Sequence, residues 1–181
     1  MTGPPSTDDV VRAATEAYLR GRTIDMSALA TELGLSRATL YRRVGNHEQL
    51  LGRVLADSTE RTYLAIEAGV TGPPGLARTL VVVERFMRTV VTLAPLKDLA
   101  RRDPVLFAKV IMSPGEVESR AARLFTELLD RNGLRFDAPT AAVAQAVIRI
   151  GDSFMYSQLL GGEPRLDDAV QVIGLLLATA K

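Results

Sequence analysis

Apolar residues recur every three or four positions along most of this chain, a spacing typical of amphipathic α-helices. No stretch alternates apolar and polar residues in the way that a half-buried strand would. The sequence therefore predicts an all-α fold of about nine or ten helices. The clearest helical stretches span residues 7–21, 26–33, 37–43, 46–68, 76–93, 104–112, 114–131, 139–160 and 167–179.

Polar residues at the predicted helix starts support these boundaries. Ser6 and Asn46 are each followed three residues later by a side chain, that of Asp9 or Gln49, which can complete a capping box. Ser36 can accept a backbone N–H at the start of the third helix. These caps support helix starts directly after Ser6, Ser36 and Asn46.

Residues 29–43 have the organisation of a helix-turn-helix. Gly34 supplies the turn, where freedom at positive φ is useful, and Ser36 caps the second helix. Two helices fixed at a steep angle in this way can place the second one in the major groove of DNA. The expected core of this unit is Leu29, Ala30, Leu33, Leu35 and Leu40, which leaves Arg37, Thr39, Arg42 and Arg43 pointing outward.

The helix at 46–68 and the break after it predict two domains. Twenty-three helical residues span about 34 Å, which is too long for a helix confined to a three-helix head. Residues 69–75 contain three Gly and two Pro and end this helix. We expect an N-terminal helix-turn-helix DNA-binding domain at 1–46 and a ligand-binding and dimerisation domain at 47–181, with the helix at 46–68 linking them.

Composition and charge narrow the functional classes. The net charge is +1, and the first fifty residues hold six Arg and six acidic residues, so a basic surface must be local. With no Cys, one His and no phosphate-binding or dinucleotide-binding motif, we expect no enzyme activity, no cofactor and no metal site. The chain lacks a signal-like segment and a membrane-length apolar run, so a cytoplasmic protein without a membrane partner is expected.

The pattern LAxxLGLSxxTLYxxVxN over residues 29–46, followed by Leu50 and Leu51, resembles the DNA-binding head of the TetR family of bacterial repressors. The resemblance covers about residues 8–55. It implies an all-α homodimer with one such head per subunit and a C-terminal body that binds a small effector. Two positions depart from the common pattern: Val44 stands where many members have an aromatic residue, and His47 stands where many have Lys.

The same resemblance assigns roles by position. Arg37, Ala38 and Thr39 are expected to face bases, and Tyr41 and Arg43 are expected to hold phosphates. The helix that starts near Ser27 often adds a phosphate contact, and His47 can keep the role of the usual Lys with a charge that depends on pH. The complete set of expected DNA contacts is Ser27, Arg37, Ala38, Thr39, Tyr41, Arg42, Arg43 and His47.

The sequence of the C-terminal body indicates its function less clearly than the N-terminal pattern does. Residues 147–156, together with the Gly162 to Asp168 segment, are similar to the QsdR-like branch of the family, which implies a lactone or short acyl effector. A polar stripe on the helix at 139–160 has two interpretations: an internal Arg149–Asp152 pair at the dimer seam, or side chains that line a ligand pocket. The stripe consists of Gln145, Arg149, Asp152 and Tyr156.

Apolar positions in the body suggest a pocket and an interface. The pocket candidates, each of which could equally be plain core, are Phe86, Met87, Val90, Phe107 and Ile111, with Asp152 and Tyr156 from the polar stripe. The helices at 114–131 and 139–160 are expected to form a four-helix dimer interface. Its expected residues are Ala121, Leu124, Leu128, Ala144 and Gly151.

Together these features predict a ligand-responsive transcriptional regulator. We expect a homodimeric repressor that binds a pseudo-palindromic operator in double-stranded DNA and is released by a small, largely apolar effector. The alternative is a small-molecule carrier or binding module that lacks sequence-specific DNA binding.

Overall fold

The computed structural model describes residues 4–157 and 162–181. In these residues it contains ten α-helices, one short π-helical segment and no strand, which confirms the all-α prediction. None of these helices is both long enough and apolar enough to cross a membrane. The elements are α1 (Thr7–Leu19), α2 (Met26–Glu32), α3 (Arg37–Val44), α4 (His47–Ala68), α5 (Leu76–Val90), α6 (Ala94–Arg102), α7 (Pro104–Phe107), η1 (Ala108–Met112), α8 (Glu116–Arg131), α9 (Thr140–Met155) and α10 (Leu166–Leu177).

Two predictions about the helices were wrong. No helix was predicted between residues 93 and 104, but α6 lies there, with Pro95 in its first turn, where the missing N–H of Pro costs no hydrogen bond. The helix predicted at 139–160 ends at Met155, and Tyr156 follows it as the C-terminal cap. The last part of that prediction, residues 158–160, lies outside the described residues.

The caps of the N-terminal helices form as the sequence predicts. Ser36 Oγ accepts the backbone N–H of Thr39 at 3.1 Å. Asn46 and Gln49 form a reciprocal capping box, with both side chain–backbone distances at 2.9 Å. Gly34 has φ +64°, a left-handed conformation that side chains rarely adopt. These short-range bonds fix the angle between α2 and α3 and the start of α4.

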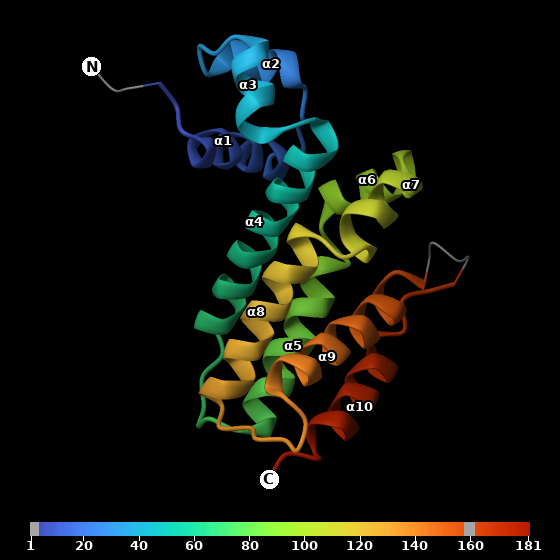
Figure 1. Ribbon diagram of the computed structural model, residues 1–181. Coiled ribbons are helices and arrows are strands. Elements are labelled where there is room, and N and C mark those ends of the chain that lie inside the picture. The colour runs from blue at the N-terminus through green and yellow to red at the C-terminus, as the bar shows by residue number, and fades with distance from the viewer. Residues whose placement is uncertain (1–3, 158–161) are drawn as a thin grey trace.

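Helix α4 runs from the N-terminal helices into the C-terminal bundle (Figure 1). Its 22 residues span about 33 Å. The N-terminal half packs against α1, and the C-terminal half packs against α5 and α8. Glu60 on α4 pairs with Arg120 and with Arg123 of α8, the latter at 2.8 Å. The helix is therefore held at both ends by different parts of the molecule.

The C-terminal bundle is built around α8. This helix lies between α4 and α9, and α10 packs against α9 and α5 (Figure 1). An aromatic cluster of Tyr63, Phe86 and Phe125 joins α4, α5 and α8, with ring centroids 5.6 to 6.3 Å apart. Tilted and edge-on ring contacts at this distance stabilise the join beyond the area that they bury.

The five residues expected at the dimer interface are buried within the chain itself. The packing of α8 against α4 and α9 leaves them almost no surface for a partner. Helical periodicity indicates a buried face, but it does not indicate whether the same chain or another one covers that face. The five residues are Ala121, Leu124, Leu128, Ala144 and Gly151, and their place in a dimer interface stays a prediction.

The N-terminal helices depend on Leu40, which is 0% exposed at the junction of α3 with α1 and α2. We expect Leu40→Ala to lower the free energy of unfolding by about 2 to 5 kcal/mol, because it leaves a cavity in a small core. Urea denaturation followed by circular dichroism measures this change. Leu64→Ala is the matched control, since Leu64 is 51% exposed on α4. A similar loss in both variants would contradict this account of the core.

Candidate DNA-binding and ligand-binding sites

Helix α3 presents one polar face to solvent. Leu40 and Val44, four residues apart, are fully buried and turn the opposite side of the helix outward. Arg42 lies on that side, and Arg37 is the first residue of the helix; both are exposed, and neither belongs to an ion pair between described residues. The other expected base-facing and phosphate-facing residues on this helix are Ala38, Thr39 and Tyr41, which are exposed or half-buried.

Two of the expected phosphate contacts, Arg43 and His47, are less accessible than Arg37 and Arg42. Arg43 is half-buried, and its Nη1 atom is buried without a hydrogen-bond partner among the described residues. His47 lines a cleft between the start of α4 and helix α6, with Asp98 and Arg102 on the opposite wall. Ser27, in contrast, is exposed at the start of α2.

A second site is a largely buried cavity lined by residues of α1, α4, α5, α8 and α9, with further residues from α6, η1 and α10. Six of the seven predicted ligand-binding residues line it. Phe107 does not, but its ring packs edge-on against that of Tyr156, with centroids 5.0 Å apart, and so supports the cavity wall. The six lining residues are Phe86, Met87, Val90, Ile111, Asp152 and Tyr156.

Sequence analysis missed the hydroxyl groups that α1 and α4 bring to this cavity. Ser58, Thr59 and Thr62 line it from α4, and Tyr18 reaches it from α1. The positions of the α4 hydroxyl groups could have been predicted, because Ser58 and Thr62 lie three and seven residues after the buried Leu55 and so face the same side of the helix. Nothing in the sequence distinguishes Tyr18 from an ordinary core residue of α1.

The predicted polar stripe on α9 divides into two parts. Arg149 pairs with Glu118 of α8 rather than with Asp152, and it also donates to the carbonyl of Met112 at 2.9 Å. Gln145 donates to the same Glu118 carboxylate. Of the two interpretations of the stripe, the Arg149–Asp152 pair does not form, because α8 supplies Glu118 as the partner of Arg149.

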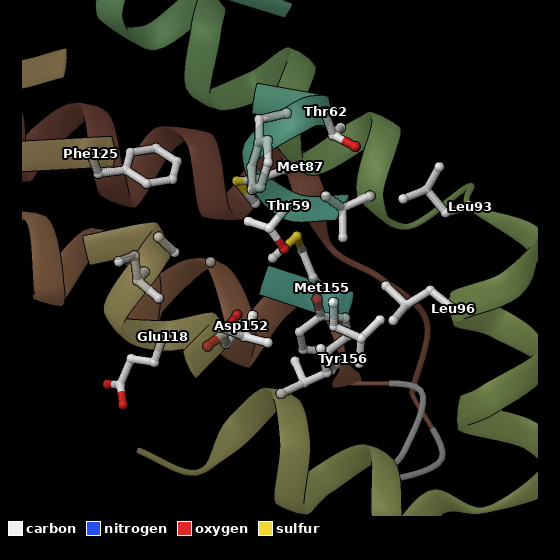
Figure 2. Close-up of a pocket in the computed structure, with 18 of the residues that line it drawn as sticks. Thr59, Thr62, Met87, Leu93, Leu96, Glu118, Phe125, Asp152, Met155 and Tyr156 are labelled. Carbon is white, nitrogen blue, oxygen red and sulfur yellow. The ribbon is translucent and has the colours of Figure 1, made fainter. Parts of the chain in front are cut away.

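Asp152 and Tyr156 form the other part of the stripe and lie next to each other in the cavity wall (Figure 2). The Glu118 side chain points away from them. The pKa of Asp152 is raised to about 7. Burial is the largest cause, the charge of Arg149 offsets it in part, and the charge of Glu118 adds to it. Near neutral pH this carboxyl is therefore close to half protonated and can donate as well as accept a hydrogen bond.

Comparisons with known protein families and solved structures point to one family. Residues 74–178 match the family described as tetracyclin repressor-like, C-terminal domain. The chain is 37% identical to the R. erythropolis transcriptional repressor QsdR from the TetR family, over 97% of this chain and 95% of that one, with a TM-score of 0.89. It is 24% identical to the TetR family repressor AlkX from Dietzia sp. strain DQ12-45-1b, over 99% of each chain, with a TM-score of 0.72, which shows a shared fold. None of the curated proteins compared with it matches.

Asp152 makes the stability of the fold depend on pH. A carboxyl whose pKa is raised on folding costs no stability below its ordinary pKa of 3.8, and the full cost is present above about pH 7. We expect Asp152→Asn to raise the free energy of unfolding at pH 8 by at most about 4 kcal/mol, and at pH 5 by less than half of that.

Chemical denaturation at the two pH values measures this difference. Asp8→Asn, at an exposed position, is the control and should change stability by less than about 0.5 kcal/mol at either pH. If Asp152→Asn gave the same gain at pH 5 and pH 8, the carboxyl would not be titrating in this range.

Proposed function

Because the chain belongs to the TetR family of transcriptional repressors, we propose that it represses transcription as a homodimer on a pseudo-palindromic operator and responds to a small effector. Members of this family are regulators and not enzymes. The observation that carries the proposal is that one helix, α4, connects the exposed cationic face of α3 with a largely apolar internal cavity. A ligand-responsive repressor requires a DNA-reading surface and a ligand cavity that are joined by a rigid element, and α4 is such an element.

The exposed face of α3 supports insertion into the major groove. Arg37, Ala38 and Thr39 begin the helix and are the proposed base contacts, since the N-terminal residues of a recognition helix reach base edges. Arg42 and Tyr41 lie further along the same face and are the proposed phosphate contacts. Arg43 and His47 are weaker candidates, because one is half-buried and the other lies in the cleft beside α6.

The outward faces of α9 and α10 support a four-helix dimer interface. The two helices pack side by side (Figure 1). On α10, Val172 is 41% exposed and Leu175 is 75% exposed. On α9, Ala142 and Ser153 are small and exposed, so a partner helix could approach closely. Exposed apolar residues of this size are typical of surfaces that a second subunit covers.

The cavity supports an uncharged effector. Its described lining is mainly aliphatic and aromatic, and none of the lining residues is Lys, Arg or His. A carboxylate ligand would therefore enter without a cationic partner and beside the partly ionised Asp152, which is costly in a desolvated site. Within the lactone and acyl classes that the QsdR-like resemblance implies, lactones and esters fit this lining better than free fatty acids.

The effector can act only if it binds two arrangements of the dimer with different affinity. Ser58, Thr59 and Thr62 place α4 in direct contact with the cavity contents. We propose that ligand shifts α4 and so changes the separation of the two α3 helices in the dimer. A coupling of about 1 to 3 kcal/mol is typical of such systems.

Operator binding tests the central claim. In fluorescence anisotropy with DNA that flanks the protein's own gene, we expect sequence-selective binding that weakens as salt is raised. Arg42→Ala should weaken binding at least about tenfold and reduce the salt slope by about two, because each subunit of the dimer loses one phosphate contact. Arg43→Ala is the matched comparison and should have the smaller effect, because Arg43 is half-buried.

Equal losses in both variants would contradict the assignment of the α3 face. Absence of sequence-selective binding by the wild-type protein would instead favour a carrier or binding module.

The proposed interface predicts the effect of a charge on α10. Leu175→Glu should convert the dimer to monomer at micromolar concentration, because it buries an unpaired carboxylate at the seam. Sedimentation velocity measures the mass directly, and Leu64→Glu, at an exposed site on α4, is the control that should remain dimeric. A Leu175→Glu dimer would place the interface on another surface.

A further inference from the structure

Tyr18 is a buried tyrosine whose hydroxyl has no hydrogen-bond partner among residues 4–157 and 162–181. It lies near the end of α1, and the residue is 7% exposed. A buried hydroxyl without a partner is unfavourable, and native structures contain few of them. The position therefore calls for a partner that the free chain does not supply.

The surroundings of Tyr18 show where that partner would lie. The side chain lines the internal cavity together with Asp152 and Tyr156. Burial raises the pKa of the Tyr156 hydroxyl, and the charges of Asp152 and Tyr18 raise it further. Asp152 and Tyr156 lie next to each other (Figure 2), and Tyr18 is a third polar side chain in the lining of this mainly apolar cavity.

These three side chains come from different parts of the molecule. Asp152 belongs to α9 and Tyr156 follows that helix directly, both in the C-terminal bundle. Tyr18 belongs to α1, which packs against α2, α3 and α4 (Figure 1). Tyr18 also lines the cleft between α1, the start of α4 and α6. It is thus the point at which the DNA-reading helices reach into the cavity.

We propose that the Tyr18 hydroxyl donates a hydrogen bond to the carbonyl or ether oxygen of an uncharged effector, so that the ligand is held in part by the first helix of the DNA-reading unit. This inference rests on the proposed function. It adds a second route of coupling: the ligand contacts the DNA-reading unit through Tyr18 as well as through α4.

Tyr18 is suited to this role by its protonation state. Burial raises the pKa of its hydroxyl well above the ordinary value near 10, so it remains a donor throughout the neutral range. A ligand oxygen that accepts from Tyr18 while the rest of the molecule packs against α5 and α9 would bridge the two parts of the chain. That bond forms fully only in one orientation of α1 relative to the bundle, which gives the ligand a preference between orientations.

The test compares Tyr18→Phe with Tyr63→Phe in the full-length protein. Tyr63 is the matched control: its hydroxyl accepts from Arg131 at 3.3 Å, and the residue does not line the cavity. The probes are γ-decalactone and methyl decanoate, which are uncharged acceptors with apolar chains, and decanoate as their anionic counterpart. Calorimetry gives the affinity of each probe, and anisotropy gives the affinity for the operator with and without saturating probe.

We expect Tyr18→Phe to bind the lactone or the ester about 3- to 10-fold more weakly than wild type, the effect of removing one neutral hydrogen bond. Tyr63→Phe should bind the probes with wild-type affinity. At saturating probe, the change in operator affinity should be smaller in Tyr18→Phe than in wild type. Without probe, Tyr18→Phe should melt at the same temperature as wild type or higher, because the substitution breaks no hydrogen bond.

Other outcomes separate the two levels of the proposal. If the neutral probes bind wild type and Tyr18→Phe equally and change operator affinity equally, this inference fails while the proposed function stands. A lower melting temperature for Tyr18→Phe without probe would also overturn it, because the hydroxyl would then have a structural partner. If no probe binds wild type, or only decanoate does, the proposed uncharged effector fails and this inference fails with it.

Discussion

The continuity of α4 is the constraint on which the rest of the structure depends. The Asn46–Gln49 capping box fixes its start, which is separated from the end of α3 by two residues, and the ion pairs of Glu60 fix its middle to α8. Between and beyond these points Ser58 and Thr62 face the cavity. Because the helix is unbroken, a change in its packing on α8 moves α3 with it and is not absorbed by a loop.

The cavity is where the molecule departs most from the rules of a stable core. Tyr18 keeps a buried hydroxyl without a partner, and Asp152 keeps a carboxyl whose ionisation burial opposes. Either group would be replaced by an apolar one if packing alone mattered. Tyr18 and Asp152 line the same cavity as the hydroxyl groups of α4, so this cavity has several polar groups whose burial lowers stability. Local conflicts of this kind are expected at functional sites.

The two sites differed in how far they could be predicted. The α3 face followed from local rules, because burial of Leu40 and Val44 determines which side chains remain outside. The same rules placed Phe86 and Met87 at a buried position, and the structure puts both in the cavity wall. They failed for Arg149, whose partner Glu118 lies on another helix 31 positions earlier in the chain.

The sequence by itself determined most of the helices, the caps of the N-terminal helices, the helix-turn-helix and the family, because these depend on contacts within a few residues and on a compact motif at 29–46. Only the tertiary structure decided what each buried face packs against. It placed Leu124 and Ala144 in the core of the chain, and it brought Tyr18 into the cavity. The physical reason is that helical periodicity records which face avoids water, whereas long-range packing decides which surface covers that face.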